Sequence, residues 1–446
     1  MIIARHVVAL CLLVGGSLVA IADPPKVIKA VPDNGDSDVD PGLTEIRIEF
    51  DLDMSQSGHS ICGGGPNFPD ITGRPHWDGK RVIIVPVKLK PDWTYNLSVN
   101  CPAAQNTRSA AGEPAENYPI TFTTRKAGNA APAAPKLTPE QNRAAIDALR
   151  TAINDRYAYR DHKRVDWKKA FEEFSPKLLA SESPAAFARE AAKLLALAKD
   201  LHNTLRVGEQ VLATGKRAVS ANADKRVLPK VVPEFTQIND VVWTGKFDDG
   251  VGYINITAWG SDDRENFDAL YAALDKLTEA KGIIVDVRFN SGGDETLARD
   301  FASCFVTKKA VYSKNKYRDP STADGWGPVY DRDVEPHKTR KPFAGRVALL
   351  IGVANMSSCE SFILMMKTSP RVKLFGEKTY GSTGNPKPHD LGNGVTAVLS
   401  SWYDMTAAGT VVEDHGISPD VEVKTKPTDF ASDDPVIKAA REWIAK

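Results

Sequence analysis

The chain has 446 residues, 42% hydrophobic and 26% charged, and its 57 lysines and arginines balance 57 aspartates and glutamates. This length exceeds one ordinary domain and predicts two or three units, with enough apolar residues for sizeable cores. The net charge of zero and the lack of a long basic run argue against nucleic acid or an anionic membrane as a partner.

The N-terminal segment at residues 1–22 has the pattern of a signal peptide. Arg5 precedes an apolar run at residues 7–21, and the small residues Ala20 and Ala22 mark a cleavage site. The run is short for spanning a bilayer, so we expect it to be removed rather than to act as an anchor. The mature chain would then be exported and not membrane-spanning, in the periplasm or outside the cell, a choice that the sequence leaves open.

Export permits disulfides, and Cys62 and Cys101 lie in one β-rich region where a bridge is plausible. Two unpaired thiols are the alternative. The cysteine spacings match no zinc site, and the sequence contains no nucleotide or flavin signature. We therefore expect no cofactor and no metal.

The region at residues 23–125 has a β pattern. Short runs alternate apolar and polar residues or are densely apolar, and turn residues separate them. We predict strands at residues 44–50, 81–85, 94–99 and 118–123. Several short strands within about 100 residues are typical of a β-sandwich.

Three segments of this region, residues 31–35 (VPDNG), 39–41 (VDP) and 46–50 (IRIEF), resemble the bacterial Ig-like modules of exported and surface-layer proteins. The resemblance implies an all-β Ig-like sandwich. Such modules act as spacers or adhesion units, so this one would contact a surface or another protein. We assign no chemistry to it.

Residues 126–137 are rich in Ala, Gly and Pro and are expected to form a linker. A helical subdomain at residues 138–205 follows, opening on the N-cap Thr138 with Pro139 at the first helical position. Apolar residues at helical spacing predict three helices, at residues 139–157, 167–179 and 183–201.

Residues 206–446 alternate buried strands with helices, which predicts a layered α/β core with parallel pairing. The expected strands are at residues 251–256, 282–287, 346–351 and 372–375. The expected helices are at residues 267–277, 295–305 and 358–366, with a short C-terminal helix after Pro435.

Two strand ends in this core carry candidate chemistry. Residues 286–293 (DVRFNSGG) end in Gly292 and Gly293, whose backbone can turn tightly and leave amides bare for an oxyanion. A glycine turn without chemistry is the alternative. At the second end, Ser357 lies between a buried strand and a helix N-terminus, where helix amides can stabilise negative charge. The alternative there is a capping box formed with Glu360.

Taken together, five motifs occur in the order found in the tail-specific, or carboxy-terminal processing, serine peptidases, a family that includes the tricorn core. They are residues 252–254 (GYI), 284–293 (IVDVRFNSGG), 357–360 (SSCE), 376–381 (GEKTYG) and 416–420 (GISPD). The resemblance covers residues 199–423. It implies a crotonase-like α/β peptidase core that cleaves protein or peptide substrates through an acyl-enzyme.

The same resemblance implies roles for individual residues. Ser357 would be the nucleophile. The oxyanion donors would be the amide of Ser358 and that of Gly292 or Gly293. Many members carry a lysine base directly after a Thr-x-Gly turn, but here that residue is Ser382, whose hydroxyl cannot serve as a base at neutral pH.

The lysine-less, tricorn-like branch takes its base from a histidine before the sheet and pairs it with a distant glutamate. The similar segments here are residues 199–204 (KDLHNT) and 412–417 (VEDHGI). We therefore expect His202 to be the general base and Glu413 to orient it. In the tricorn branch a serine directly precedes the histidine, whereas Leu201 stands here, so that supporting hydroxyl is missing.

Several alternatives remain open. His415 could replace His202 as the base, and Asp414 could replace Glu413 as the acid. Lys378, before the Thr-x-Gly turn, would have to reach the serine from a different place. The chain could also be an inactive binding protein for a hydrophobic ligand or peptide on the same fold, or an Ig-like adhesin with a degenerate peptidase tail. Residues 207–249 are too few for the PDZ domain of many relatives.

Overall fold

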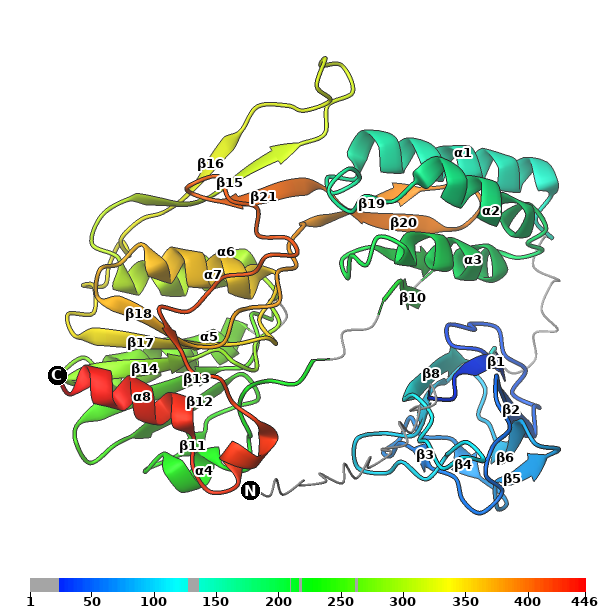
Figure 1. The fold of residues 1–446 in the computed structure, drawn as a ribbon, viewed down its shortest axis with the longest axis horizontal. Coiled ribbons are helices and arrows are strands. Elements are labelled where there is room, and N and C mark those ends of the chain that lie inside the picture. The colour runs from blue at the N-terminus through cyan, green and yellow to red at the C-terminus, as the bar shows by residue number, and fades with distance from the viewer. Residues whose placement is uncertain (1–23, 127–135, 209, 216–218, 261–263) are drawn as a thin grey trace, which may run out of the picture. The chain divides into compact units, whose positions relative to one another are not determined.

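Figure 1 shows the computed structural model of the chain, which describes residues 24–126, 136–208, 210–215, 219–260 and 264–446. The expected signal peptide and most of the expected linker lie outside the described residues. The chain forms two compact units, Met1–Ala134 and Pro135–Lys446. Among the described residues, no helix combines the length and the apolar character that a membrane crossing needs.

The first unit contains two antiparallel sheets, which confirms the all-β prediction. One sheet has the order β1 (Val27–Val31), β2 (Glu45–Phe50), β6 (Val82–Lys88) and β4 (Asp70–Ile71), with β5 (His76–Asp78) also paired to β6. The other has the order β3 (Ile61–Cys62), β7 (Thr94–Val99) and β8 (Tyr118–Thr123). Alternate residues of β2 are buried, as its alternating sequence requires. A disulfide joins Cys62 to Cys101, with their Cα atoms 6.2 Å apart.

In the second unit, three helices pack on a four-stranded antiparallel sheet. The helices are α1 (Pro139–Arg156), α2 (Trp167–Leu179) and α3 (Pro184–Ala196). The side chain of Thr138 caps α1 by accepting a hydrogen bond of 3.2 Å from the amide of Gln141. The sheet has the order β10 (Gln210–Ala213), β9 (Thr204–Val207), β20 (Thr396–Ser400) and β19 (Pro386–Asp390).

This sheet contains strands from both sides of the domain boundary that the sequence predicts. The expected boundary at residues 205/206 runs through β9, and β20 lies almost two hundred residues further along the chain. Leu205 of β9 and Leu399 of β20 share one buried core with Leu149 of α1 and Leu194 of α3. The helices therefore do not form a subdomain by themselves, because their apolar faces are completed by strands from the C-terminal part of the chain.

The main sheet has seven strands and is parallel from β13 to β22. Its order is β11 (Thr236–Gln237), β12 (Val242–Lys246), β13 (Val251–Ile256), β14 (Gly282–Asp286), β17 (Arg346–Ile351), β18 (Val372–Gly376) and β22 (Val421–Glu422). The layered α/β prediction is confirmed.

Helices cover both faces of this sheet (Figure 1). One face packs against α5 (Arg264–Lys276), α6 (Glu295–Ala302) and α7 (Ser358–Lys367). The other packs against α4 (Leu228–Val231) and α8 (Pro435–Ile444). Successive side chains of each strand enter opposite layers, which is why residues 283–285 of β14 and 347–351 of β17 are unbroken apolar runs.

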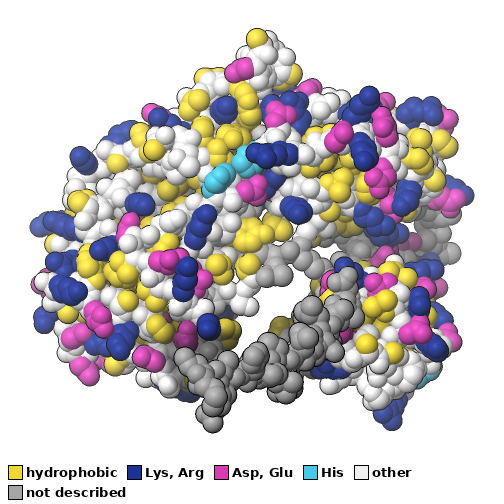
Figure 2. Space-filling model, viewed as in Figure 1, with side chains coloured by type: hydrophobic (Ala, Val, Ile, Leu, Met, Phe, Trp, Pro, Cys, Tyr) yellow, Lys and Arg dark blue, Asp and Glu magenta, His cyan; other side chains and the backbone are white. Residues whose placement is uncertain are grey.

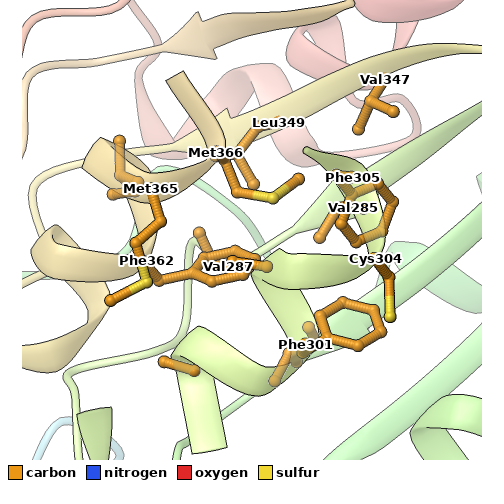
Figure 3. Close-up of a cluster of buried hydrophobic side chains, with 14 of the residues drawn as sticks. Val285, Val287, Phe301, Cys304, Phe305, Val347, Leu349, Phe362, Met365 and Met366 are labelled. Atoms are coloured by element: carbon orange, nitrogen blue, oxygen red, sulfur yellow. The ribbon is translucent and has the colours of Figure 1, made fainter. Parts of the chain in front are cut away.

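Figure 3 shows part of the first layer. Val285 and Leu349 of the sheet lie with Phe301 of α6 and with Phe362 and Met366 of α7. All five side chains are completely buried. This packing fixes α7, and therefore its N-terminal residues, against the carboxyl ends of the central strands.

A third sheet was not predicted. It is antiparallel, with the order β16 (Tyr330–Val334), β15 (Ala310–Tyr317) and β21 (Trp402–Thr406). The described residues also include two short 3-10 helices, η1 (Ser303–Phe305) and η2 (Pro427–Phe430). On the surface that Figure 2 presents, acidic and basic side chains are interspersed, in line with the zero net charge.

Candidate active site

Ser357 stands where β17 turns into α7. Its backbone has φ 56° and ψ −134°, a conformation that non-glycine residues rarely adopt and that costs about 1–3 kcal/mol. The amide of Ser357 donates to the carbonyl of Ser382 at 2.7 Å. Among the described residues, its hydroxyl makes no capping hydrogen bond to the helix. The capping-box alternative is therefore wrong, and the hydroxyl is left available for other contacts.

The glycine turn after β14 packs directly against Ser357. The side-chain amide of Asn355 donates to the carbonyls of Val287, at 2.5 Å, and Asn290, at 2.9 Å, and so holds the two strand ends together. A Cβ atom on Gly292 would lie 2.9 Å from Cβ of Ser357, and the φ of Gly292 is 114°. Only glycine fits this position, because both the space and the backbone conformation exclude a side chain.

The second glycine is enclosed as well. A Cβ atom on Gly293 would lie 1.9 Å from the carbonyl oxygen of Trp259. The carbonyl of Gly293 accepts a hydrogen bond of 2.6 Å from the hydroxyl of Ser358. The amide of Gly292 already donates to Oδ1 of Asn290 at 2.8 Å. Of the two glycine amides named from the sequence, that of Gly292 is thus occupied.

Glu360, in the first turn of α7, holds the turn at residues 379–382. Its Oε1 accepts from the hydroxyl of Thr379 and, at 2.9 Å, from the amide of Gly381, while its Oε2 accepts from the amide of Ser382 at 3.0 Å. Burial raises the pKa of Glu360 to about 8, although the three donors act in the opposite direction. Glu360 therefore fixes the backbone of the turn that faces Ser357.

His202 lies in the turn between α3 and β9, and its side chain is 10% exposed. Nδ1 of its ring lies 3.1 Å from the hydroxyl oxygen of Ser382 and 3.8 Å from Oδ1 of Asp200. Burial lowers the pKa of His202, and the carboxylate of Asp200 partly offsets that shift. The imidazole is therefore kept neutral in the pH range where a general base must accept a proton.

Pairing between β9 and β20 brings this turn to the core. Thr204 of β9 is the register partner of Val398 of β20. Beside this pair, Ser400 donates from its amide to Asn203 at 3.2 Å and from its hydroxyl to Asp200 at 2.8 Å. The His202 turn is thus tied to β20, the second strand after the turn of Ser382 in the chain.

Glu413 is buried against Lys163. Its Oε1 lies 2.5 Å from Nζ of Lys163, and its Oε2 accepts from the amide of Thr383 at 2.8 Å. Burial and the carboxylate of Asp200 raise the pKa of Glu413, and Lys163 acts against that rise. With both oxygens of Glu413 engaged in this way, Asp200 is the carboxylate next to the His202 ring.

The alternatives to His202 and Glu413 lie elsewhere. Nδ1 of His415 is 3.0 Å from the carbonyl oxygen of Glu413, and His415 lines a cavity of about 960 Å³ together with Lys163 and Asp414. Asp414 is paired with Lys163, at 2.6 Å, and with His162, at 3.2 Å.

Ser357 lines a different cavity from the one that His415 lines. Lys378 is exposed.

The cavity beside Ser357 has a volume of about 360 Å³ and a mixed polar and apolar lining. The residues around it include Asp294, Glu295, Ser361, Thr383, Asn385, Trp402 and Asp404. Asp404 accepts a hydrogen bond of 2.6 Å from the hydroxyl of Ser313, and burial raises the pKa of its carboxyl group to about 6. A cavity of this size with a mixed lining, next to the nucleophile candidate, can admit part of a peptide.

Three residues of this site have no role in the prediction from the sequence. Asp200 lies in the motif at residues 199–204, of which the prediction uses only the histidine. Ser382 enters that prediction only as the residue that replaces a lysine. Lys163 belongs to no motif, and only its burial, with 4% of the side chain exposed, reveals it.

Comparison with known proteins connects this geometry to a family. A model described as peptidase family S41 matches residues 250–423, and one described as a bacterial Ig-like domain matches residues 22–124. The carboxy-terminal processing protease CtpA of Bacillus subtilis is 27% identical over 228 residues, covering 50% of this chain and 44% of that protein. The tricorn protease of Thermoplasma acidophilum is 26% identical over 204 residues, covering 43% of this chain and 17% of that protein. The chain thus spans less than half the length of these relatives.

Solved structures share the fold. A peptidase candidate from Parabacteroides merdae has a TM-score of 0.58 at 23% identity, covering 70% of this chain and 98% of that one. Mature CPAF has a TM-score of 0.51 at 12% identity, covering 69% of this chain and 96% of that one. The chain therefore carries a peptidase family S41 domain, matched over residues 250–423, behind a bacterial Ig-like domain, matched over residues 22–124.

Proposed function

We propose that this protein is an exported serine endopeptidase in which Ser357 is the nucleophile and His202 the general base. The observation that carries the proposal is the backbone of Ser357. A strained φ of 56° at a strand-to-helix junction presents the hydroxyl beside a glycine turn and a cavity. Strain of this kind persists only where the surrounding structure holds it, and it clusters at active sites.

In the proposed reaction, Oγ of Ser357 attacks the carbonyl carbon of a peptide bond while Nε2 of His202 takes the hydroxyl proton. The tetrahedral oxyanion accepts hydrogen bonds from the amides of Ser358 and Gly293. We choose Gly293 because the amide of Gly292 already donates to Asn290. His202 then returns the proton to the leaving amine, and a water molecule hydrolyses the resulting ester by the same path in reverse.

Two features support His202 as the base. Ser382 contacts both partners, since its carbonyl accepts from the amide of Ser357 and its hydroxyl lies 3.1 Å from Nδ1 of His202. The depressed pKa of His202 keeps the ring unprotonated at neutral pH. Nδ1 of His415, by contrast, lies 3.0 Å from the carbonyl oxygen of Glu413.

Glu413 would act on the site indirectly, through the residues that it contacts, and not by a direct contact with the His202 ring. It holds the amide of Thr383, the residue after Ser382, and neutralises the buried ammonium of Lys163. Asp200, next to the ring, would stabilise the imidazolium that forms in the transition state. The substrate would be a protein or peptide entering the cavity of Ser357, and the Ig-like unit would contact a surface or another protein.

The test is labelling of the purified protein with a fluorophosphonate probe, which reacts with activated serines. We expect labelling of the wild type, none of Ser357→Ala, and at least about 100-fold slower labelling of His202→Ala. His415→Ala serves as the matched control and should label at the wild-type rate. Folding of each variant is checked by circular dichroism.

Two results would contradict the proposal. Unchanged labelling of His202→Ala with loss in His415→Ala would move the base to His415. A well-folded wild type that does not label would favour the alternative of a binding protein on the same fold.

A further inference from the structure

We infer that Ser382 is the positioning residue for His202, accepting a hydrogen bond from Nδ1–H so that Nε2 is presented to Ser357. This inference rests on the proposed function. In the sequence, His202 has no supporting hydroxyl directly before it, because Leu201 precedes it in the chain. In the folded chain a hydroxyl reaches the ring from another direction, 180 residues further on.

The backbone of Ser382 is fixed on both sides. Its amide donates to Oε2 of Glu360 at 3.0 Å, and its carbonyl accepts from the amide of Ser357 at 2.7 Å. The residue is 2% exposed. With the backbone held and a single side-chain torsion to the hydroxyl, its Oγ has little freedom to move relative to Ser357. A ring anchored to this oxygen is therefore anchored relative to the nucleophile.

The contact also selects the tautomer of the ring. If Nε2 of His202 is to accept the serine proton, Nδ1 must carry the hydrogen of the neutral ring, and that hydrogen needs an acceptor. The hydroxyl oxygen of Ser382, at 3.1 Å, is within hydrogen-bonding distance, whereas Oδ1 of Asp200, at 3.8 Å, is not.

Asp200 is, moreover, already engaged. It accepts from the hydroxyls of Tyr157, at 3.0 Å, and Ser400, at 2.8 Å, and from the backbone amide of His202, at 2.9 Å. Its charge still favours a proton on the near edge of the ring, at Nδ1. Ser382 supplies the direct hydrogen bond to the ring, and Asp200 acts on the ring through its negative charge.

Lys163 is the other charged group acting on His202, and it lowers the pKa of the ring. Its ammonium is offset by Glu413 and Asp414, at 2.5 and 2.6 Å. The balance of charge around His202 therefore does not depend on Ser382, which is uncharged. Removing the hydroxyl changes the hydrogen bonding of the ring and leaves these charges in place.

The experiment measures the rate of fluorophosphonate labelling against pH for Ser382→Ala and Ser382→Thr. We expect Ser382→Ala to label about 10- to 100-fold more slowly, because a ring without its anchor misplaces Nε2. The midpoint of its acid limb should fall below that of the wild type, because the imidazolium loses an acceptor for Nδ1–H. Ser382→Thr keeps the hydroxyl and should recover most of the rate.

The matched control is Ser369→Ala, a buried serine after the C-terminus of α7, which should leave both rate and midpoint unchanged. If Ser382→Ala does not fold, Ser382→Cys replaces it, because a thiol keeps the size but is a weak acceptor. It should show the same two changes.

A Ser382→Ala protein that labels at the wild-type rate, or more slowly with an unchanged midpoint, would overturn the inference. Either result would leave the proposed function standing. Absence of labelling in the folded wild type would instead count against the proposed function itself.

Discussion

Nζ of Lys163 lies 2.5 Å from Oε1 of Glu413, and the two side chains are only 4% and 1% exposed. Lys163 belongs to the connection between α1 and α2, whereas Glu413 lies in the loop before β22. Their ion pair joins the helical part of the second unit to the loop that holds Thr383. An ion pair removed from water in this way gains little net stability, but losing one partner is costly.

Replacing Lys163 by Met should therefore lower the free energy of unfolding by about 3–5 kcal/mol, because it strands the carboxyl group of Glu413 in a dry site. Urea unfolding measures the change. Lys136→Met is the matched control, since Lys136 pairs with Glu182 at 2.6 Å but both side chains are about two-thirds exposed. The Lys136→Met variant should lose at most about 1 kcal/mol of its free energy of unfolding. A double variant, Lys163→Met with Glu413→Gln, should lose less than the sum of the single losses; additive losses would mean that the two groups are not coupled.

The pH dependence of Ser357 reactivity should report on His202. In the proposed reaction only the neutral ring can accept the serine proton, so activity would be present above the pKa of His202 and lost as the pH falls through it. Burial moves that pKa below the ordinary 6.5. We expect the acid limb of fluorophosphonate labelling to have its midpoint below pH 6.5. A midpoint clearly above 6.5 would show that a different group, or a solvated histidine, controls the reaction.

Arg288 should be essential for stability because it joins the end of β14 to α8. Its guanidinium donates to both oxygens of Asp286, at 3.0 and 2.7 Å, and to both oxygens of Asp434, at 3.1 and 2.8 Å, with all three side chains buried. Arg288→Met should lose about 3–5 kcal/mol, because it leaves two buried carboxylates without a cation.

Arg288→Lys should recover only part of this loss, since an ammonium cannot form two bidentate contacts. Arg226→Met is the control, because Arg226 pairs with Asp224 at 2.6 Å but its side chain is 88% exposed. Hydrogen exchange should show α8 opening first in Arg288→Met. Equal unfolding midpoints for Arg288→Met and Arg226→Met would contradict this assignment.

Asp404 should make the protein less stable as the pH rises. Its pKa is raised from 3.8 to about 6 by burial, so between these values the folded protein holds a proton that the unfolded chain has lost. The free energy of unfolding therefore falls across this interval, by about 3 kcal/mol in full.

The side chain introduced by Asp404→Asn stays neutral, so this variant should lack the pH-dependent fall in the free energy of unfolding. Thermal unfolding at pH 4.5 and pH 7.5 tests it: the stability of the variant relative to the wild type should rise between the two pH values. Asp331→Asn, at a side chain 59% exposed, is the control. A constant difference between Asp404→Asn and wild type would show that the buried carboxyl group stays ionised throughout.

Much of the secondary structure follows from local pattern. The strand predicted at residues 94–99 is β7, and the helix predicted at residues 167–179 is α2, with identical bounds. Alternation with period two, or apolar residues at helical spacing, defines which face of such an element is buried. The position of Ser357 also follows locally, because a buried apolar strand and a helix start meet there.

The strands that build the site's surroundings did not follow from local pattern. β9, β20 and β21 are short, and none of them was predicted. A run of four or five residues carries little periodic signal, and nothing in it specifies a partner almost two hundred residues away. For the same reason, local pattern gave no sign that the boundary expected at residues 205/206 falls within a strand, β9.

The sequence by itself determined the two kinds of unit, the peptidase motifs, the nucleophile candidate Ser357 and the histidine candidate His202, because each depends on neighbouring residues or on an ordered set of motifs. Only the tertiary structure decided that Ser382 contacts His202, that Lys163 forms an ion pair with Glu413 and that Asp200 lies beside the His202 ring. These contacts join segments that strand pairing and core packing bring together. Hydrogen bonds and ion pairs act over a few ångströms in space, whatever the separation along the chain.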